Sequence, residues 1–140
     1  MNDEDQVRRR RAAWKEAFEA GDVDGIMTFY APELQSYDIM PPRQFVGLDH
    51  WRRNWESFFG QFACDQKLEF ADLAILCSGD LAVVRGLTRL LGTMGGQPID
   101  VWTRQTNILK RIEGEWMVVH DHVSIPVDFA TARPCMDLKP

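Results

Sequence analysis

The two halves of this 140-residue chain have different hydrophobic periods, and this difference limits the fold more than any other feature. Up to about residue 62, apolar residues recur every three or four positions, as they do on one face of a helix. Beyond that point, long β-rich runs are separated by short turns that contain glycine. Helices followed by strands are typical of an α+β domain, and the length fits one domain.

The first helix is expected over residues 3–20, because acidic residues crowd its start and Gly21 follows its end. A second, short helix begins near Asp22, with Ile26, Phe29 and Tyr30 facing inward. It stops at Ala31-Pro32, since proline lacks the amide hydrogen that a continuing helix needs.

A short strand over residues 34–40 should follow, closed by Pro41-Pro42. The third helix begins near Asp49 and carries a stripe of aromatic residues, typical of a core-facing helix, at Trp51, Trp55, Phe58, Phe59 and Phe62. We expect antiparallel strands near residues 66–77, 81–93, 99–111 and 116–125.

The strand over residues 81–91 is apolar on both faces, with Val83 and Leu87 on one side and Ala82 and Val84 on the other. A sheet with one face in water alternates more cleanly than this. Helices cover one face only, so we expect a second subunit to cover the other and form a homodimer through the sheet.

Composition excludes several classes of protein. Sixteen basic against 21 acidic residues give a net charge of −5, which argues against nucleic acid as a partner. No apolar run approaches the roughly 20 residues of a membrane span, and no apolar segment follows the N-terminal charges as in a secretory signal. Three widely spaced cysteines favour neither disulfides nor a zinc knuckle, so a cytoplasmic setting is expected.

The first candidate site residue is Asp38, which lies between Tyr37 and Ile39 just before the diproline. Desolvation in such apolar surroundings raises the pKa of a carboxyl and makes it a usable general base. The alternative is that Asp38 caps a turn or pairs with an arginine.

The second candidate is the pair His120 and His122, which period-two geometry places on one side of the last strand with Trp116 and Ser124. Two histidines could begin a zinc site, but no third ligand has a suitable spacing, so no metal is expected. Whether the imidazoles face a pocket or the dimer interface stays open.

Polar residues inside apolar strands form the third candidate group: Arg85, Arg104, Gln105, Asn107 and Asp121. One interpretation is a salt bridge between Arg85 and Asp121 across the sheet. The other is the polar lining of a concave site that accepts a carboxylate. The run from Arg8 to Arg11 is interpreted as at least partly a solvated helix face.

Two stretches of sequence carry a family resemblance. The segment Ala20-Gly21-Asp22-Val23-Asp24, followed by Phe29-Tyr30-Ala31-Pro32 and Tyr37-Asp38, resembles the nuclear-transport-factor-2-like superfamily, in particular its SnoaL-like and ketosteroid-isomerase-like members. The segments Arg104-Gln105-Thr106-Asn107 and His120-Asp121-His122 resemble it too, and are also similar to the association domain of calcium/calmodulin-dependent kinase II.

The resemblance covers about residues 5–128 of a single domain, 1–140, with a short C-terminal tail. It implies a cystatin-like cone, in which a curved antiparallel sheet wraps around the N-terminal helices and leaves a deep pocket at the wide end.

Carried over by position, Asp38 corresponds to the general base of the ketosteroid isomerases. The tyrosine that donates a hydrogen bond to the oxyanion in those enzymes corresponds to Trp14. The protonated aspartic acid beside it corresponds to about Gln105. Neither residue supplies the same donor, so efficient steroid isomerisation is not expected. Arg85 lies near a pocket arginine of the kinase association domain, and Asn107 stands where that domain has another.

The resemblance implies a cofactor-free domain that binds a small apolar or carboxylate-bearing ligand, as an isomerase or cyclase with Asp38 as the base. The expected ligand-binding residues are Trp14, Tyr37, Asn54, Arg85, Gln105, Asn107, Asp121 and His122. The alternative is a non-catalytic association module whose sheet face contacts its partner.

Overall fold

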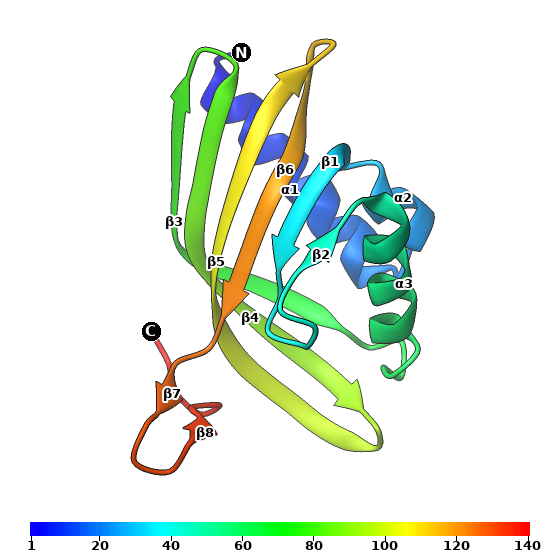
Figure 1. Cartoon of the computed structure of the whole chain (residues 1–140), viewed down its shortest axis with the longest axis vertical. Helices are drawn as coiled ribbons and strands as arrows, with labels where there is room; N and C mark the ends of the chain where they lie inside the picture. Colours follow the sequence, from blue (N-terminus) through cyan, green and yellow to red (C-terminus); the bar gives the residue numbers. More distant parts are fainter.

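The computed structural model describes all 140 residues as a curved six-stranded sheet with three helices packed on its concave side (Figure 1). The strands lie in the order β2-β1-β6-β5-β4-β3. The helices are α1 (Asp3–Glu19), α2 (Val23–Met27) and α3 (Leu48–Phe59). The sheet strands are β1 (Tyr30–Tyr37), β2 (Phe45–Val46), β3 (Lys67–Ser78), β4 (Leu81–Met94), β5 (Gln97–Ile112) and β6 (Glu115–Ser124). The predicted α+β architecture is confirmed.

The three predicted helices are present, and side chains cap the first two. The side chain of Asn2 accepts a hydrogen bond from the amide of Asp5 over 2.8 Å at the start of α1. Asp22 does the same for Gly25 over 2.9 Å at the start of α2. These bonds satisfy amides that a helix leaves without a partner at its first turn. No helix combines the length and apolarity that crossing a bilayer requires.

The boundary between α2 and β1 was predicted wrongly. The helix ends at Met27, and Tyr30 and Pro32 belong to β1, which runs parallel to β6 rather than antiparallel. The pairing of β1 with β6 shifts register between Tyr30 and Gln35. A residue without an amide hydrogen fits such an irregular stretch of strand, so Pro32 does not exclude strand here.

Strands β3 to β6 form an antiparallel meander, as predicted, and their side chains alternate between two faces. Even-numbered residues of β4, such as Val84 and Thr88, are buried on the concave side beneath the helices. Odd-numbered residues of β5, such as Gln105 and Asn107, are buried on the same side. Arg85, which has the opposite parity, is exposed on the convex side.

A bulge in β6 reverses this alternation. Leu109 pairs with Val118 and Ile108 pairs with His120, which leaves Val119 as an extra residue. Trp116 and Asp121 therefore both lie on the concave side, although they are five positions apart and strict alternation would place them on opposite faces. The predicted placement of His120 and His122 on the same side as Trp116 is wrong for this reason.

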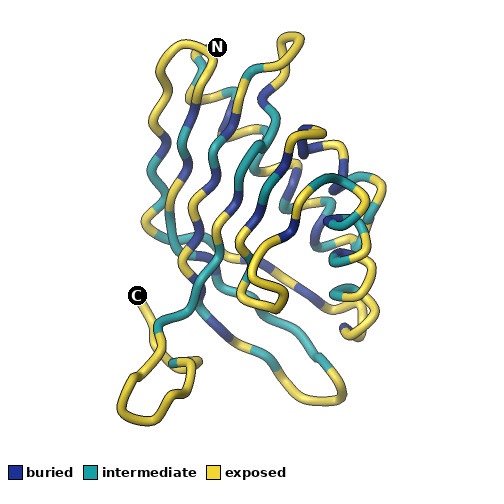
Figure 2. The backbone as a smooth tube through the Cα atoms, in the orientation of Figure 1, coloured by how far each residue is buried: buried dark blue, intermediate teal, exposed yellow.

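The core lies between the helices and the concave face (Figure 2). One cluster gathers the aromatic residues of α1 and α3, among them Trp14, Phe18, Trp51 and Trp55. A second cluster packs Val7 of α1 against β3 to β6. The C-terminal segment forms a separate hairpin of β7 (Val127–Asp128) and β8 (Arg133–Pro134), which is exposed almost throughout.

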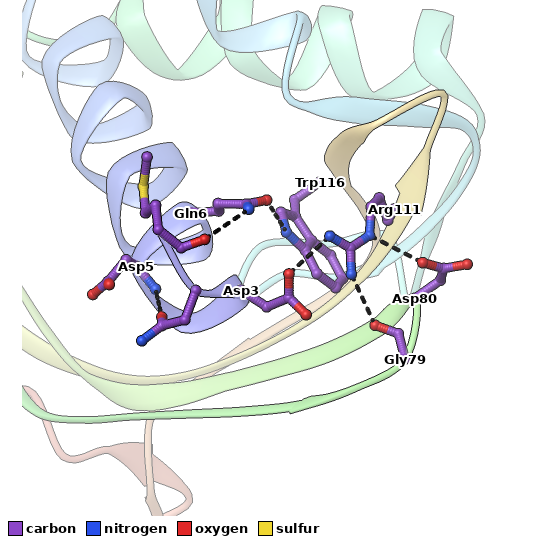
Figure 3. A network of polar contacts seen from close by, with 9 residues as sticks. Asp3, Asp5, Gln6, Gly79, Asp80, Arg111 and Trp116 are labelled. Atoms are coloured by element: carbon purple, nitrogen blue, oxygen red, sulfur yellow. Dashed lines mark hydrogen bonds and ion pairs between the residues drawn. The ribbon is translucent and has the colours of Figure 1, made fainter.

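Arg111 fixes the start of α1 against the sheet (Figure 3). Its guanidinium donates to Asp3 over 2.8 Å, to Asp80 over 3.0 Å and to the carbonyl of Gly79 over 3.2 Å. It also lies 4.6 Å from the ring centroid of Trp116. These contacts join the first turn of α1 to the turn between β3 and β4, and so determine which residues of α1 face the sheet.

Replacing Leu34, which has no exposed surface in the middle of β1, should destabilise the fold strongly. Leu34→Ala leaves a cavity in the core and should lower the free energy of unfolding by about 2–5 kcal/mol in urea denaturation. Leu138→Ala is the control, because Leu138 is half exposed in the C-terminal segment. Equal effects of the two substitutions would contradict this description of the core.

Candidate acid–base site

Asp38 directly follows β1 and is half-buried beside α3. The amide nitrogen of Asn54 donates to one carboxylate oxygen over 3.1 Å, and the backbone amide of Ile39 donates to the other over 2.9 Å. Burial raises the pKa of Asp38, while these two hydrogen bonds oppose the shift. The pKa is thus raised, as the general-base interpretation requires. The hydrogen bond from Ile39 is the local turn contact of the alternative interpretation, but no arginine pairs with Asp38.

Asp121 on β6 is the second carboxyl group of the site and is 3% exposed. The amide nitrogen of Asn107 on β5 donates to it over 3.1 Å. Burial raises the pKa of Asp121 to about 7, and the negative charge of Asp38 adds to this effect, whereas Arg11 and Asn107 oppose it. A fraction of Asp121 is therefore protonated at neutral pH, which is unusual for a carboxyl group.

Arg11 brings the positive charge of the site from α1. Its two terminal nitrogens donate to the side-chain oxygens of Asn107 over 2.9 Å and Gln105 over 3.0 Å. Its guanidinium lies 4.2 Å from the ring centroid of Phe70. Burial lowers the pKa of Arg11 to about 10, which still leaves it charged at neutral pH.

Arg11 is not predicted as a site residue from the sequence, because it belongs to a run of four arginines. Only part of that run is solvated: Arg9 is exposed and Arg8 pairs with Glu4 over 2.7 Å, as expected of an outer helix face. The available signal was helical spacing, since Arg11 stands four residues after Val7 and three before Trp14, which are both buried.

Hydrogen bonds fix the orientation of the two amide side chains. The Gln105 oxygen accepts from Arg11 and also from the hydroxyl of Thr88 over 3.0 Å. The Asn107 side chain accepts from Arg11 with its oxygen and donates to Asp121 with its nitrogen. A continuous chain of hydrogen bonds therefore joins the guanidinium of Arg11 to the carboxyl of Asp121.

Trp14 and Tyr30 form a buried pair next to this chain. The indole nitrogen of Trp14 donates to the Tyr30 hydroxyl over 3.0 Å. Burial raises the pKa of Tyr30 well above its ordinary value, and the charge of Asp121 adds to the shift. Trp14 stands where the ketosteroid isomerases have a tyrosine, and the phenol of Tyr30 on β1 lies beside it in the interior. From the sequence, Tyr30 is predicted only to face inward.

The enclosed space between α1 and the sheet has a volume of about 30 Å³. This is room for about two water molecules, so the deep pocket expected from the sequence is small in this structure. The reason is that the side chains of α1 fill the concave side. Twelve residues line the cavity: Val7, Arg10, Arg11, Trp14, Phe29, Tyr30, Val84, Gln105, Asn107, Leu109, Trp116 and Val118.

Of the nine predicted site residues, only Trp14, Gln105 and Asn107 line the cavity; Asp38, Asn54 and Asp121 are not part of its lining, and the other three lie on the convex face. Tyr37 and His122 are exposed on the convex face, where the ring of Tyr37 is 5.3 Å from that of His122 and 5.0 Å from that of His120. Arg85 is exposed on the same face, so the predicted salt bridge between Arg85 and Asp121 does not form. No three potential ligands among the His, Cys, Asp and Glu side chains gather as a metal site.

The fold and this polar, largely buried site place the chain in a known class. The sequence profile of the SnoaL-like domain matches residues 7–128, and the chain belongs to this family. A nuclear-transport-factor-2-like protein of unknown function from Pseudomonas putida KT2440 has a similar structure, with a TM-score of 0.89 and 30% sequence identity. The match covers 97% of this chain and 95% of that one.

Two more distant structures show the same fold. A ketosteroid isomerase-like protein from Erwinia carotovora atroseptica has a TM-score of 0.75 and 21% identity, over 89% of this chain and 97% of that one. A protein with a cystatin-like fold from Caulobacter vibrioides has a TM-score of 0.75 and 16% identity, over 91% and 92% of the chains. No curated protein matches the sequence significantly.

The raised pKa of Asp121 should make stability depend on pH. The unfolded chain ionises Asp121 near pH 3.8, whereas the folded protein holds the proton until about pH 7. The unfolded state binds fewer protons between these values, so the free energy of unfolding should fall there, by roughly 4 kcal/mol in total. Asp121→Asn stays neutral and should lack this decrease.

Urea denaturation of both proteins from pH 2.5 to pH 8 measures this difference. The variant should gain stability relative to the wild-type protein as the pH rises. Near and below pH 3, Asp121 is largely protonated in both the folded and the unfolded chain. The two proteins should therefore have parallel stability profiles there, which serves as the internal control. Parallel profiles over the whole range would show that Asp121 ionises normally.

Proposed function

We propose that this protein is a cofactor-free catalyst of proton transfer next to a carbonyl group, as in an isomerisation or a ring closure. The observation that carries the proposal is the pair of carboxyl groups, Asp38 and Asp121, in one site with different surroundings. Two carboxyls with different proton affinities can divide the roles of base and acid between them.

Asp38 is suited to the role of base. It is the more exposed of the two carboxyls, and Asn54 holds one of its oxygens in place. Its raised pKa makes the carboxylate a stronger base than an ordinary aspartate. Asp121 is suited to the role of acid, because burial keeps part of it protonated at neutral pH.

The amide and indole groups position the substrate in this proposal. Asn54 donates to Asp38 and Asn107 donates to Asp121, and Trp14 and Gln105 line the cavity together with Asn107. Gln105 and Asn107 are held by Arg11, so their orientation does not need to change when a substrate enters. A pure association module has no use for two carboxyls with raised pKa, and this observation favours catalysis.

Deuterium exchange of 2-tetralone, an apolar bicyclic ketone, tests the base directly. The wild-type protein should accelerate exchange of the acidic C1 protons in D₂O, measured by proton NMR. Asp38→Asn should reduce the protein-catalysed rate by at least about 100-fold, because a positioned base contributes about 100- to 10,000-fold.

Asp128→Asn is the matched control, because Asp128 is exposed in the C-terminal hairpin, outside the six-stranded sheet. It should exchange 2-tetralone at the wild-type rate. Unfolding curves of each variant separate a loss of catalysis from a loss of structure. Full activity of a folded Asp38→Asn protein would exclude Asp38 as the base.

We also propose that the convex face forms a homodimer. Leu76, Val83 and Ile108 lie side by side on β3, β4 and β5, and Leu76 is 64% exposed. A row of apolar residues from the edge strand β3 to β5 is costly in water, and a second copy of the same face covers it by a twofold axis. The histidines His120 and His122 lie on this face rather than in the cavity.

Val83→Arg should weaken the dimer at least about tenfold, because it places a charge in the centre of the apolar row. Sedimentation equilibrium measures the change. Val46→Arg on β2 is the control, since Val46 is also exposed but lies at the opposite edge of the sheet from the apolar row. A wild-type protein that stays monomeric at high micromolar concentration would refute the dimer.

A further inference from the structure

The guanidinium of Arg11 has no anionic partner within ion-pair distance. Its two terminal nitrogens donate to neutral amide oxygens, those of Gln105 and Asn107. Its third nitrogen, Nε, is buried and has no hydrogen-bond acceptor. A buried cation is costly unless an anion or several hydrogen bonds compensate it, and here the compensation is incomplete.

The cavity beside Arg11 has unused donors and few unused acceptors. The Tyr30 hydroxyl accepts from Trp14 and donates to no protein group, so its proton is free. The Gln105 oxygen already accepts two hydrogen bonds, and the Asn107 oxygen accepts from Arg11. Since buried polar groups are normally paired, the missing partner of this cavity is a hydrogen-bond acceptor.

A second guanidinium strengthens the positive character of the cavity wall. Arg10 also lines the cavity and lies 4.3 Å from the ring centroid of Phe29. It donates to the backbone carbonyls of Trp116 and Thr28 and forms no ion pair. The remaining wall is largely apolar, with Val84, Leu109 and Val118 among its residues.

We infer that this cavity binds the carboxylate of a small ligand, so that the substrate of the site is a carbonyl compound that also bears a carboxylate. The inference rests on the proposed function and names its substrate class. A volume of about 30 Å³ accepts two water-sized atoms, which matches the two oxygens of one carboxylate. Guanidinium groups bind carboxylates with geometry that ammonium groups do not reproduce.

The hydrogen-bond chain through Asn107 links the proposed carboxylate site at Arg11 to Asp121. Asn107 bonds to Arg11 with its oxygen and to Asp121 with its nitrogen. A carboxylate held at Arg11 is therefore one side chain away from the acid of the site.

Acetate and its neutral isostere acetamide test the inference with the wild-type protein. Titrations at constant ionic strength, followed by ¹H–¹⁵N NMR of the Trp14 and Trp116 indole groups, which both line the cavity, should show saturable shifts with acetate. Acetamide should bind at least about tenfold more weakly, because it lacks the charge that Arg11 prefers. Equal shifts with both compounds would refute the inference.

Arg11→Gln should abolish the preference for acetate over acetamide, and Arg11→Lys should reduce it. Arg9→Gln is the matched control, since it removes the same charge from an exposed position of the same helix and should leave the preference unchanged. If Arg11→Gln does not fold, Arg11→Lys and the wild-type comparison still decide the question.

The neutral ketone 2-tetralone separates this inference from the proposed function. Exchange that depends on Asp38, together with no preference for acetate, would refute the carboxylate site alone. A preference for acetate, together with exchange that is unchanged in a folded Asp38→Asn protein, would support the carboxylate site and refute the role of Asp38 as the base.

Discussion

The site depends on one extra residue in β6. Because Val119 forms a bulge, Asp121 turns toward the helices and the two neighbouring histidines turn toward the convex face. Without the bulge, strict alternation would place Asp121 outside with Arg85 and His120 inside with the core. Bulges are common next to functional sites, since they redirect a side chain without changing the strand order. The hydrogen-bond chain from Arg11 through Asn107 ends at the inward carboxyl that results.

The sequence predicts the elements well, because each has a strong local signal. The aromatic stripe of α3, the acidic start of α1 and the glycine-containing turns of the meander depend on residues close together in the chain. The α2–β1 boundary fails because the decisive contact, the parallel pairing of β1 with β6, joins residues more than 80 positions apart. Nothing near Pro32 indicates that its missing amide hydrogen falls at an irregular part of that pairing.

The site is only partly predictable for a similar reason. Asp38, Asn54, Gln105 and Asn107 were named from type, position and family resemblance. Asn54 bonds to Asp38, and Arg11 bonds to both Gln105 and Asn107, but their role in ligand binding stays a prediction. Arg85 and His122 were assigned by the same reasoning and lie outside, because the face of a strand residue depends on parity that one bulge reverses. Arg11 was hidden by its neighbours: four consecutive arginines suggest a solvated surface, whereas a helix places each of them on a different side.

The charges of the concave side explain why its two carboxyls differ. Asp121 is fully enclosed, so desolvation acts on it more strongly than on Asp38, which keeps partial contact with water. Arg11 is linked to Asp121 through Asn107, and this positive charge limits how far the pKa of Asp121 can rise. Removing the charge of Arg11, or neutralising it with a bound anion, would strengthen the hold of Asp121 on its proton. A ligand that carries its own negative charge into the site would therefore favour the protonated form of the very group that is placed to act as its acid.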